Sequence, residues 1–432
     1  MVGCAKRIRS EMISSTKAPP PVLNKWIKGI SMAKPMPQPA SLSLPEYRLK
    51  AFKTNQFEQN ADGFQNIKFG YFGEVGGLLS AVKKSGRDNL AVSAHDLAAE
   101  ELGDALWYLI NIASALTVDP DQLGDQCIKL LRSRFEECDQ APVTPVTFRH
   151  IDSLMEVRRA PGSIDRSTQL GSLAYHAGIL TRTTYAEYQS MGQGPRAEHM
   201  GTHLAELAIV CASFDLKLEE VAKANLEKIH SRWPGEEGVY PKQFDAGHPS
   251  HEQFPPLFEI EFIERGTREN GHVVQSLNGV FIGDPLTDNS NEPDDYRFHD
   301  VFHLAYVAFL GWSPVLRGLL KRKRKSVSKT DENEDGARAM IIEEGIATWI
   351  FNHAEGQNFY ADERRRSLDY GVLKQIRGMV EGYEVDKCQL WQWERAIMAG
   401  FEIFLKIRHH RGGTVVVDVL NHTMEFFPPT KN

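Results

Sequence analysis

The sequence predicts a mainly α-helical fold, in which two similar helical bundles in tandem precede a mostly helical C-terminal domain with a small β element. Apolar residues recur every three or four positions over most of the chain, which is the period of helices with one buried face. One helical pattern, Glu100–Leu116, returns as Glu198–Phe214 at a constant offset of 98 residues. Alternating apolar patterns, which indicate strands, are confined to FEIEFIERG and HVVQSLNGVFIG. The late run GGTVVVDVL is either another strand or a buried apolar segment.

The composition is that of an ordinary soluble protein and limits the function. The 432 residues are 41% hydrophobic and 25% charged, which suffices for two or three domains. No stretch approaches about 18 uninterrupted apolar residues, so we expect no membrane span. The net charge of −7 argues against a bulk nucleic-acid binder. The five cysteines are scattered without CxxC spacing, which favours a reducing, cytoplasmic location.

Residues 1–42 are rich in Lys, Arg, Pro and Ser and have no sustained apolar period. We interpret them as a disordered basic tail; a later start, at Met32 or Met36, and a transit peptide are the alternatives. Breaks in pattern and composition divide the remainder into four parts. These are a first helical repeat, residues 43–140; a second repeat, residues 141–240; a linker with a possible β hairpin, residues 241–295; and a C-terminal helical domain, residues 296–432.

The helix expected at Ser93–Thr117 organises the first repeat. Ser93 and Asp96 have the spacing of a capping box, and Pro120 follows the last apolar position. The apolar face recurs in steps of four and three, at Leu102, Leu106, Leu109, Ala113 and Leu116.

Carboxylates crowd one part of this helix. Glu100, Glu101 and Asp104 lie on adjacent faces, where each like-charge pair costs an isolated helix about 0.2–0.5 kcal/mol. The preceding helix, expected at Lys68–Lys84, adds Glu74 among three glycines, which argue for close backbone approach by a helix or a ligand. A hard divalent cation such as Mg²⁺ offsets such repulsion through carboxylate oxygens. The alternative is a solvated acidic face.

Three segments carry a resemblance to a known family: Leu44–Thr54, Gly73–Lys84 and Glu100–Ala113. Their order and spacing resemble the all-α nucleoside triphosphate pyrophosphohydrolases of the MazG-like and dimeric dUTPase group. The resemblance implies a helical bundle in which four acids, in an ExxE and an ExxD motif, hold Mg²⁺ (or Mn²⁺) against a triphosphate.

Glu74 matches the first acid of the family pattern, and Glu101 and Asp104 match the last pair. Gly77 stands where the family has its second Glu, which puts metal affinity in doubt. Glu100, beside the last pair, is the candidate to supply the missing oxygen.

The second repeat departs from the acid pattern, since His199 stands opposite Glu101 and Thr202 opposite Asp104. It nevertheless ends in a segment, Lys217–Pro234, that resembles the closing helix of the family. In this segment the polar residues at helical spacing are Asn225, Lys228 and Arg232.

Each repeat thus matches the family where the other departs from it. Because family members resemble bundles that share active sites between subunits, the tandem is interpreted as a fused pseudo-dimer with one composite active site. A homodimer of the chain is a further expectation. The alternative for Asn225 and Lys228 is that they merely decorate an exposed helix.

The implied reaction is hydrolysis of a nucleoside triphosphate between its α and β phosphates, which gives the monophosphate and pyrophosphate. Glu74 or Glu100 is the expected general base. The residues expected to contact phosphate are Lys83, Lys84, Lys228 and Arg232. Trp107 or Tyr108 is expected to stack on the base, although aromatic residues at this spacing are more often core.

The C-terminal region has a second candidate metal site. His299 and His303 are four apart on one expected helix with Asp300 between them, and Glu343 and Glu344 lie on another helix. Two histidines and a carboxylate from a facing helix suffice for a transition-metal site. The alternatives are hydrogen-bonded core histidines and, less favoured, a protease related to the HExxH type.

Two other functions remain open from the sequence. In one, the loss of the acid at position 77 has left a nucleotide-binding module without turnover, which regulates a C-terminal metal-dependent activity of His299, His303 and Glu343. In the other, both regions are catalytic. Between the two C-terminal helices, Lys321–Gly336 is basic, then acidic, without an apolar period, and is expected to be a mobile surface loop.

Overall fold

The computed structural model describes residues 40–87, 93–138, 141–156, 164–235, 238–267, 270–362 and 367–430. The chain divides into two units, Met1–Ser41 and Leu42–Asn432, and the second holds every element described below. Nearly all of the expected basic tail, residues 1–42, lies outside the described residues.

The expected mainly α-helical class is confirmed, and the described residues between 42 and 235 form helices and their connections. Their buried apolar side chains form one continuous core. The helices are α1 (Leu44–Lys53), α2 (Ala61–Arg87), α3 (Ala94–Ala115), α4 (Pro120–Arg134), α5 (Phe148–Met155), α6 (Arg166–Arg182), α7 (Tyr185–Ser190), α8 (Gln193–Ser213) and α9 (Leu218–Arg232).

Helix α3 begins and ends as its sequence predicts. The hydroxyl of Ser93 accepts a hydrogen bond from the backbone N–H of Asp96 at 3.1 Å, which caps the N-terminus, and α3 ends before Pro120. Helix α2 is longer than the expected Lys68–Lys84, since it runs from Ala61 to Arg87 and its first turns already bury Phe64 and Ile67.

The two expected repeats pack reciprocally. Helix α3 contacts α2 and α9, whereas α8, its counterpart 98 residues later, contacts α6 and α4. A Cβ atom at Gly103 of α3 would lie 3.1 Å from the Cβ of Asn225 of α9, and one at Gly201 of α8 would lie 2.6 Å from the Cβ of Gln126 of α4. At these two positions, 98 residues apart, glycine therefore allows the close approach of a neighbouring helix.

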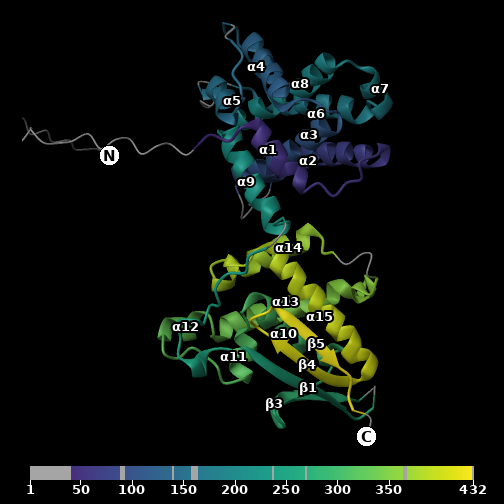
Figure 1. Cartoon of the computed structure of the whole chain (residues 1–432), viewed down its shortest axis with the longest axis vertical. Coiled ribbons are helices and arrows are strands. Elements are labelled where there is room, and N and C mark those ends of the chain that lie inside the picture. Colours follow the sequence, from purple (N-terminus) through teal and green to yellow (C-terminus); the bar gives the residue numbers. More distant parts are fainter. Residues whose placement is uncertain are drawn as a thin grey trace, which may run out of the picture. The chain divides into compact units, whose positions relative to one another are not determined.

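Residues 238–430 form a second hydrophobic core around one antiparallel sheet, with strand order β3-β2-β1-β4-β5. The strands are β1 (Leu257–Arg265), β2 (His272–Leu277), β3 (Val280–Leu286), β4 (Gly412–Asp418) and β5 (Thr423–Phe427). The helices are α10 (Asp300–Leu310), α11 (Pro314–Leu319), α12 (Ser328–Asn333), α13 (Ala337–Glu355), α14 (Tyr370–Met379) and α15 (Leu390–His410). Figure 1 shows α10 and α15 beside the strands, and both contact β4 and β5.

The expected hairpin is confirmed, but it does not belong to a linker that ends at residue 295. Strand β1 pairs with β4 as well as β2, so Ile260 lies opposite Val415 at the centre of the sheet. On β1, Phe258, Ile260 and Phe262 are buried and alternate with more exposed residues. The strands before residue 295 and those after residue 411 thus bury their apolar faces in one core.

The prediction of a mobile loop at Lys321–Gly336 is wrong. The Arg324 guanidinium is buried and pairs with Asp335 (2.6 Å) and Glu384 (2.6 Å), while the nearby Arg317 pairs with Asp245 (2.9 Å). The segment lacks an apolar period because buried ion pairs, rather than apolar side chains, hold it in place.

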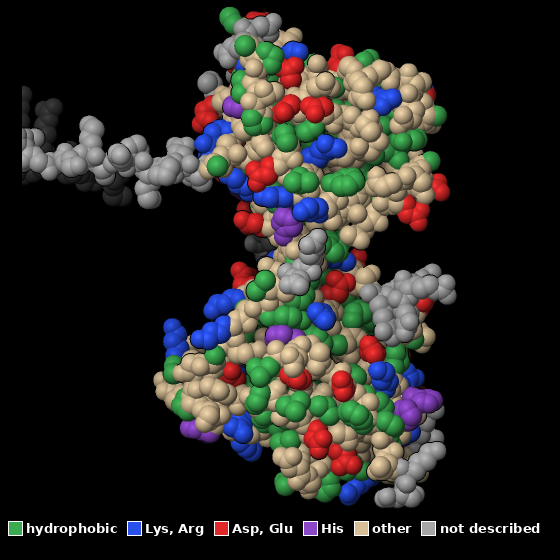
Figure 2. Space-filling model, viewed as in Figure 1, with side chains coloured by type: hydrophobic (Ala, Val, Ile, Leu, Met, Phe, Trp, Pro, Cys, Tyr) green, Lys and Arg blue, Asp and Glu red, His purple; other side chains and the backbone are tan. Residues whose placement is uncertain are grey.

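Two surface properties bear on function. No helix within the described ranges is both long and apolar enough to cross a bilayer. On the face shown in Figure 2, Lys and Arg side chains are interspersed with Asp and Glu rather than gathered in one basic patch.

Candidate functional site

The predicted carboxylates lie where α2 packs against α3. Glu74 of α2 faces Glu101 of α3, and the two carboxyl groups form a hydrogen bond. Asp104 lies about one helical turn after Glu101. Glu100, the residue before Glu101, faces Lys228 of α9. We call these four residues, together with Asn225 and Lys228 of α9, the acidic site.

Crowding of the carboxylates shifts their pKa values. Burial, together with the charges of Asp104 and Glu101, raises the pKa of Glu74 to about 8. Burial also raises the pKa of Glu101 and that of Asp104. Burial alone would raise the pKa of Glu100 too, but Lys374 and Lys228 outweigh it and lower that pKa. The Glu74–Glu101 pair therefore holds a proton in common near neutral pH.

Helix α9 completes the acidic site from the other repeat. The Asn225 amide donates a hydrogen bond to Asp104 at 3.0 Å and accepts one from the Tyr47 hydroxyl at 2.9 Å. The Lys228 ammonium group pairs with Asp104 and lies 3.3 Å from Glu100. These contacts join the two residue sets that the sequence divides between the repeats, so Asn225 and Lys228 do not merely decorate an exposed surface.

A cavity of about 350 Å³ opens beside the acidic site. Its walls are mostly aromatic and apolar, whereas Glu74, Asp104 and Lys228 lie at its polar side. Trp107 is nearly buried and donates its indole N–H to Thr54 at 3.0 Å, so that only part of the ring faces the cavity. The remaining lining residues are Thr54, Gln56, Phe57, Tyr108, Ile229, Arg232, Trp233 and Tyr370.

Two expected phosphate contacts are not at this cavity. Lys83 and Lys84 are exposed near the end of α2, and neither lines it. Arg232 does line it and donates a hydrogen bond to the carbonyl of Leu368 at 2.6 Å. Lys374, which lies 2.5 Å from Glu100, was not among the predicted site residues, because it belongs to a distant part of the chain.

Gly77 lies against Glu101 rather than Glu100. A Cβ atom at position 77 would be 2.4 Å from Glu101 Oε2, so the Glu101 carboxylate occupies the space into which a side chain at 77 would project. The Glu100 carboxylate instead faces Lys228 and Lys374, because it points about 100° away from Glu101 around the helix. Glu100 therefore does not occupy the place of the acid that is missing at position 77, contrary to expectation.

The corresponding place in the second repeat is lined by histidines. The His199 and His203 rings lie 5.2 Å apart, and the His203 and His176 rings lie 5.9 Å apart. Arg134 of α4 pairs with Glu206 of α8 at 2.8 Å. At the two positions that correspond to Glu101 and Asp104, the described part of this half has His199 and Thr202.

The second candidate site lies between α10 and α13. Within the described ranges, one group of three His, Cys, Asp or Glu side chains has potential ligand atoms all within 4.8 Å of one another. It consists of His299, His303 and Glu344, which we call the histidine centre. The Glu344 carboxylate lies 3.6 Å from His299 Nε2 and 3.5 Å from His303 Nε2.

Asp300 and Glu343 differ in their relation to the histidine centre. Asp300 Oδ1 lies 3.2 Å from His299 Nε2 and 3.9 Å from His303 Nε2, so it is a neighbour of the expected metal position. Glu343 is fully buried and lies 2.7 Å from the opposite nitrogen, His303 Nδ1. The expectation of Glu343 as a metal ligand is therefore corrected: Glu344 faces the centre, and Glu343 orients His303.

The buried charges of the histidine centre are strongly coupled. Burial alone would lower the pKa of His303, but Glu343 and Glu344 outweigh burial and raise that pKa well above its usual value. Burial alone would raise the pKa of Glu344, but the two histidines lower it.

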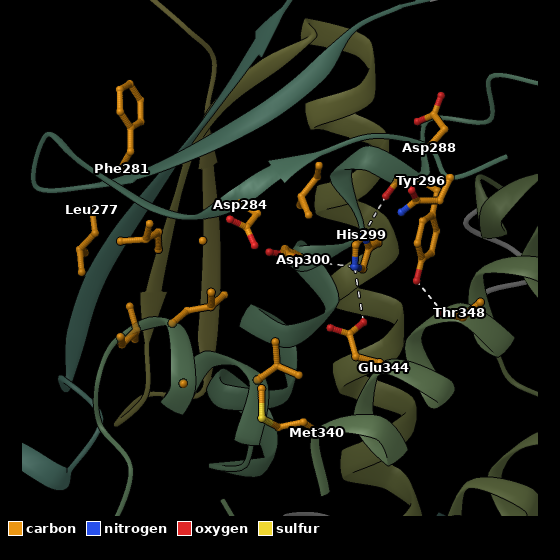
Figure 3. A pocket seen from close by; sticks show the side chains of 18 of the residues that line it. Leu277, Phe281, Asp284, Asp288, Tyr296, His299, Asp300, Met340, Glu344 and Thr348 are labelled. Atoms are coloured by element: carbon orange, nitrogen blue, oxygen red, sulfur yellow. Dashed lines mark hydrogen bonds and ion pairs between the residues drawn. The ribbon is translucent and has the colours of Figure 1, made fainter. Parts of the chain in front are cut away.

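The histidine centre lies in the wall of a cavity of about 1510 Å³ between β3, α11 and α13. Figure 3 shows His299 between Asp300 and Glu344, with Tyr296 bonded to Thr348 on one side and Asp284 on the other. Leu277, Phe281 and Met340 line a more apolar part of the same cavity.

Comparison with known proteins gives one match. Residues 239–430 match the family model described as the MazG C-terminal domain. No curated protein and no solved structure matches the chain. The matched range contains the whole five-stranded sheet and the histidine centre, a region for which the sequence had suggested no relative. The match relates this C-terminal part of the chain to the MazG family.

Proposed function

We propose that the chain is a Mg²⁺-dependent nucleoside triphosphate pyrophosphohydrolase whose catalytic centre is the acidic site. One observation carries the proposal: carboxylates of α2 and α3 meet Asn225 and Lys228 of α9 beside a cavity with aromatic walls. Carboxylates suit the metal and phosphate part of a nucleotide, and aromatic rings suit its base. The relation of residues 239–430 to the MazG family supports a nucleotide-related role.

The donor set is suited to Mg²⁺. Glu74, Glu101 and Asp104 offer hard oxygen donors, and their pKa values are raised first by burial and then by neighbouring carboxylates, so a bound cation would stabilise their charged forms. These three residues would hold the ion. When bound, Mg²⁺ neutralises phosphate oxygens and acidifies the attacking water.

The remaining roles belong to the side chains of the chain itself. Glu74 accepts the proton of the attacking water, because its carboxylate lies at the polar side of the cavity. Lys228 exchanges Asp104 for a phosphate oxygen, and Arg232 provides a second cation at the cavity. Tyr108 and the exposed edge of Trp107 contact the base.

The test is release of pyrophosphate from a panel of ribo- and deoxyribonucleoside triphosphates with Mg²⁺ or Mn²⁺. We expect Glu101→Gln to abolish release. Glu227→Gln, an exposed position on α9 next to Lys228, is the matched control and should retain it. The proposal is wrong if no triphosphate is hydrolysed by the folded, metal-supplied protein, or if Glu101→Gln behaves as the wild type.

A second candidate function has its own supporting observation. Lys228 already pairs with Asp104, and the space beside Gly77 is taken by Glu101, which is itself one of the three matching acids. A site of this kind suits a nucleotide-binding module that does not turn over its ligand and that regulates the C-terminal region. Saturable nucleotide binding without pyrophosphate release would favour this function over hydrolysis.

A further inference from the structure

We propose that the histidine centre binds one divalent transition-metal ion through His299 Nε2, His303 Nε2 and the Glu344 carboxylate. The three ligand atoms come from facing helices and lie within 4.8 Å of one another, so one ion can contact all three. Two imidazoles and a carboxylate form a donor set of the kind that binds Zn²⁺, Mn²⁺ or Fe²⁺. This site is independent of the acidic site, whose donors are all oxygens.

The first argument is the state of the two imidazoles. His303 Nδ1 is hydrogen-bonded to Glu343 at 2.7 Å, and His299 Nδ1 to the carbonyl of Tyr296 at 2.9 Å. When Nδ1 of a neutral imidazole carries the hydrogen, Nε2 presents its lone pair. A carboxylate or carbonyl partner on the far nitrogen is the usual arrangement behind metal-bound histidines.

The second argument is an unsatisfied buried atom. The His303 side chain is fully buried, yet its Nε2 has no hydrogen-bond partner and faces Glu344 and His299. A buried polar nitrogen without a partner is destabilising. An ion at this position would satisfy it, whereas Glu343 contacts the other nitrogen and Glu344 Oε2, at 3.5 Å, is too far away for a good hydrogen bond.

The third argument is the charge of the surroundings. Asp300, Glu343 and Glu344 surround two histidines, and the adjoining cavity adds Asp284 and Asp294. Among the described residues that line this cavity, Lys321 is the one with a permanent positive charge. Such a cavity attracts a cation before it attracts an anionic ligand.

The geometry also leaves room for a further ligand. Three protein ligands do not complete the coordination of Zn²⁺ or Mn²⁺, and His299, Asp300 and Glu344 line the cavity of about 1510 Å³. A water molecule or a substrate oxygen can therefore approach the ion from the cavity. Asp300, whose other oxygen accepts a hydrogen bond from Gln275, is placed either to bind the ion or to accept a proton from that water.

The test is a titration of chelator-treated, nucleotide-free full-length protein with Co²⁺, followed by visible absorption, and with Zn²⁺, followed by elemental analysis after dialysis. We expect one ion per chain at this site and ligand-field bands that report nitrogen ligation. His299→Gln and Glu344→Gln should each weaken the affinity at least about tenfold, and Glu343→Gln by about 10–100-fold through the orientation of His303.

Two controls make the result decisive. His353→Gln changes a histidine on the same helix that contacts Gln357 instead of the centre, and should bind Co²⁺ as the wild type does. Glu101→Gln should also retain the Co²⁺ spectrum, which separates this site from the acidic site. Glu344 is 42% exposed, so its variant should fold even if variants of the buried His303 do not. Stoichiometric binding that survives both His299→Gln and Glu344→Gln, or no binding at all, would overturn the proposal.

Discussion

The acidic site and the histidine centre both gather carboxylates, but the chain balances their charge in different ways. In the acidic site, Lys228 pairs with Asp104, and Glu74 shares a proton with Glu101. In the histidine centre, the far nitrogen of each imidazole is held by a neighbour, and the near nitrogens of His299 and His303 converge with Glu344. The acidic site is thus neutralised by its own lysine and a shared proton. In the histidine centre the three ligand atoms already converge, and an entering ion would displace the proton that the raised pKa of His303 keeps there.

Because of this difference, we expect the two sites to bind metal under different conditions. At the acidic site the ion pair between Asp104 and Lys228 must break before Asp104 can bind the metal and Lys228 can bind a phosphate oxygen. We therefore expect metal and nucleotide to bind together. At the histidine centre no ion pair with a lysine has to be broken, so we expect the ion to bind without a substrate. The predictions below test this contrast, beginning with the largest expected effect.

A third buried carboxylate, Asp335, is paired with arginines, and its removal is expected to cost the most stability. Asp335 is fully buried and pairs with Arg324 at 2.6 Å, with Arg317 at 3.6 Å. We expect Asp335→Ala to lower the free energy of unfolding by about 3–5 kcal/mol, because it removes a buried carboxylate that neutralises two guanidinium groups and accepts the backbone N–H of Arg324, which leaves Arg324 with Glu384 and Arg317 with Asp245. Urea unfolding measures the change. Glu332→Ala, exposed on α12, is the control, and a loss under about 1 kcal/mol for Asp335→Ala would contradict the prediction.

Removing Lys228 tests whether the cation of the acidic site is exchangeable. We expect Lys228→Met to lower kcat/KM for the triphosphate about 100-fold, or about 2.7 kcal/mol, because a phosphate contact is lost. The metal-free variant should also be less stable than the wild type at neutral pH, since Asp104 keeps only Asn225, and Mg²⁺ should restore part of that loss.

The matched control is Lys223→Met, which removes a lysine of the same helix that pairs with Glu219 at 2.9 Å. It should leave kcat/KM unchanged. Unchanged turnover in Lys228→Met would show that Lys228 serves structure alone and would favour the non-catalytic nucleotide-binding module.

The shared proton of Glu74 predicts a pH dependence for the acidic site without metal. The pKa of Glu74 is raised to about 8 in the folded state, above its usual value of 4.5, so the folded state binds more protons between these values. Stability contributed by this proton is present below about pH 4.5 and is lost as the pH rises toward 8.

Thermal unfolding of chelator-treated protein between pH 5 and 9 measures this contribution. We expect the melting temperature of Glu74→Gln to fall less steeply over the same range than that of the wild type, and Mg²⁺ with nucleotide to flatten the wild-type profile. Parallel profiles for wild type and Glu74→Gln would mean that the carboxylates are too far apart in solution to share a proton.

Much of the fold follows from local sequence patterns. The cap at Ser93, the apolar period of α3 and the alternation of β1 are local signals, and each element lies where its pattern predicts. The sheet is different, because pairing of β1 with β4 joins residues about 150 positions apart, which no local pattern encodes. The prediction of a mobile loop at Lys321–Gly336 was wrong for a related reason. The charged residues of this segment have buried partners, such as Glu384, that lie far away in the sequence.

The candidate sites divide in the same way. Residue types and helical spacing selected Glu74, Glu101 and Asp104, as well as His299 and His303, from the sequence. Spacing alone did not distinguish Glu343 from Glu344, because neighbouring positions on a helix differ by about 100° and the facing helix decides which one points inward. Tyr47 and Lys374, which contact Asn225 and Glu100, reach the acidic site only through tertiary packing.

The smallest expected effect concerns the position where the chain departs from the family pattern. A Cβ atom at Gly77 would meet Glu101 Oε2 at 2.4 Å, whereas one at Gly76 would have no neighbour within 4 Å. Both Gly→Ala changes should favour the helix by up to about 1 kcal/mol. Only Gly77→Ala should also displace the Glu101 carboxylate, and we expect it to lower turnover about tenfold, or about 1.4 kcal/mol. Measured side by side, equal turnover in the two variants would mean that the contact between Gly77 and Glu101 does not position the catalytic carboxylate; a loss confined to Gly77→Ala would mean that glycine is kept there to make room for Glu101.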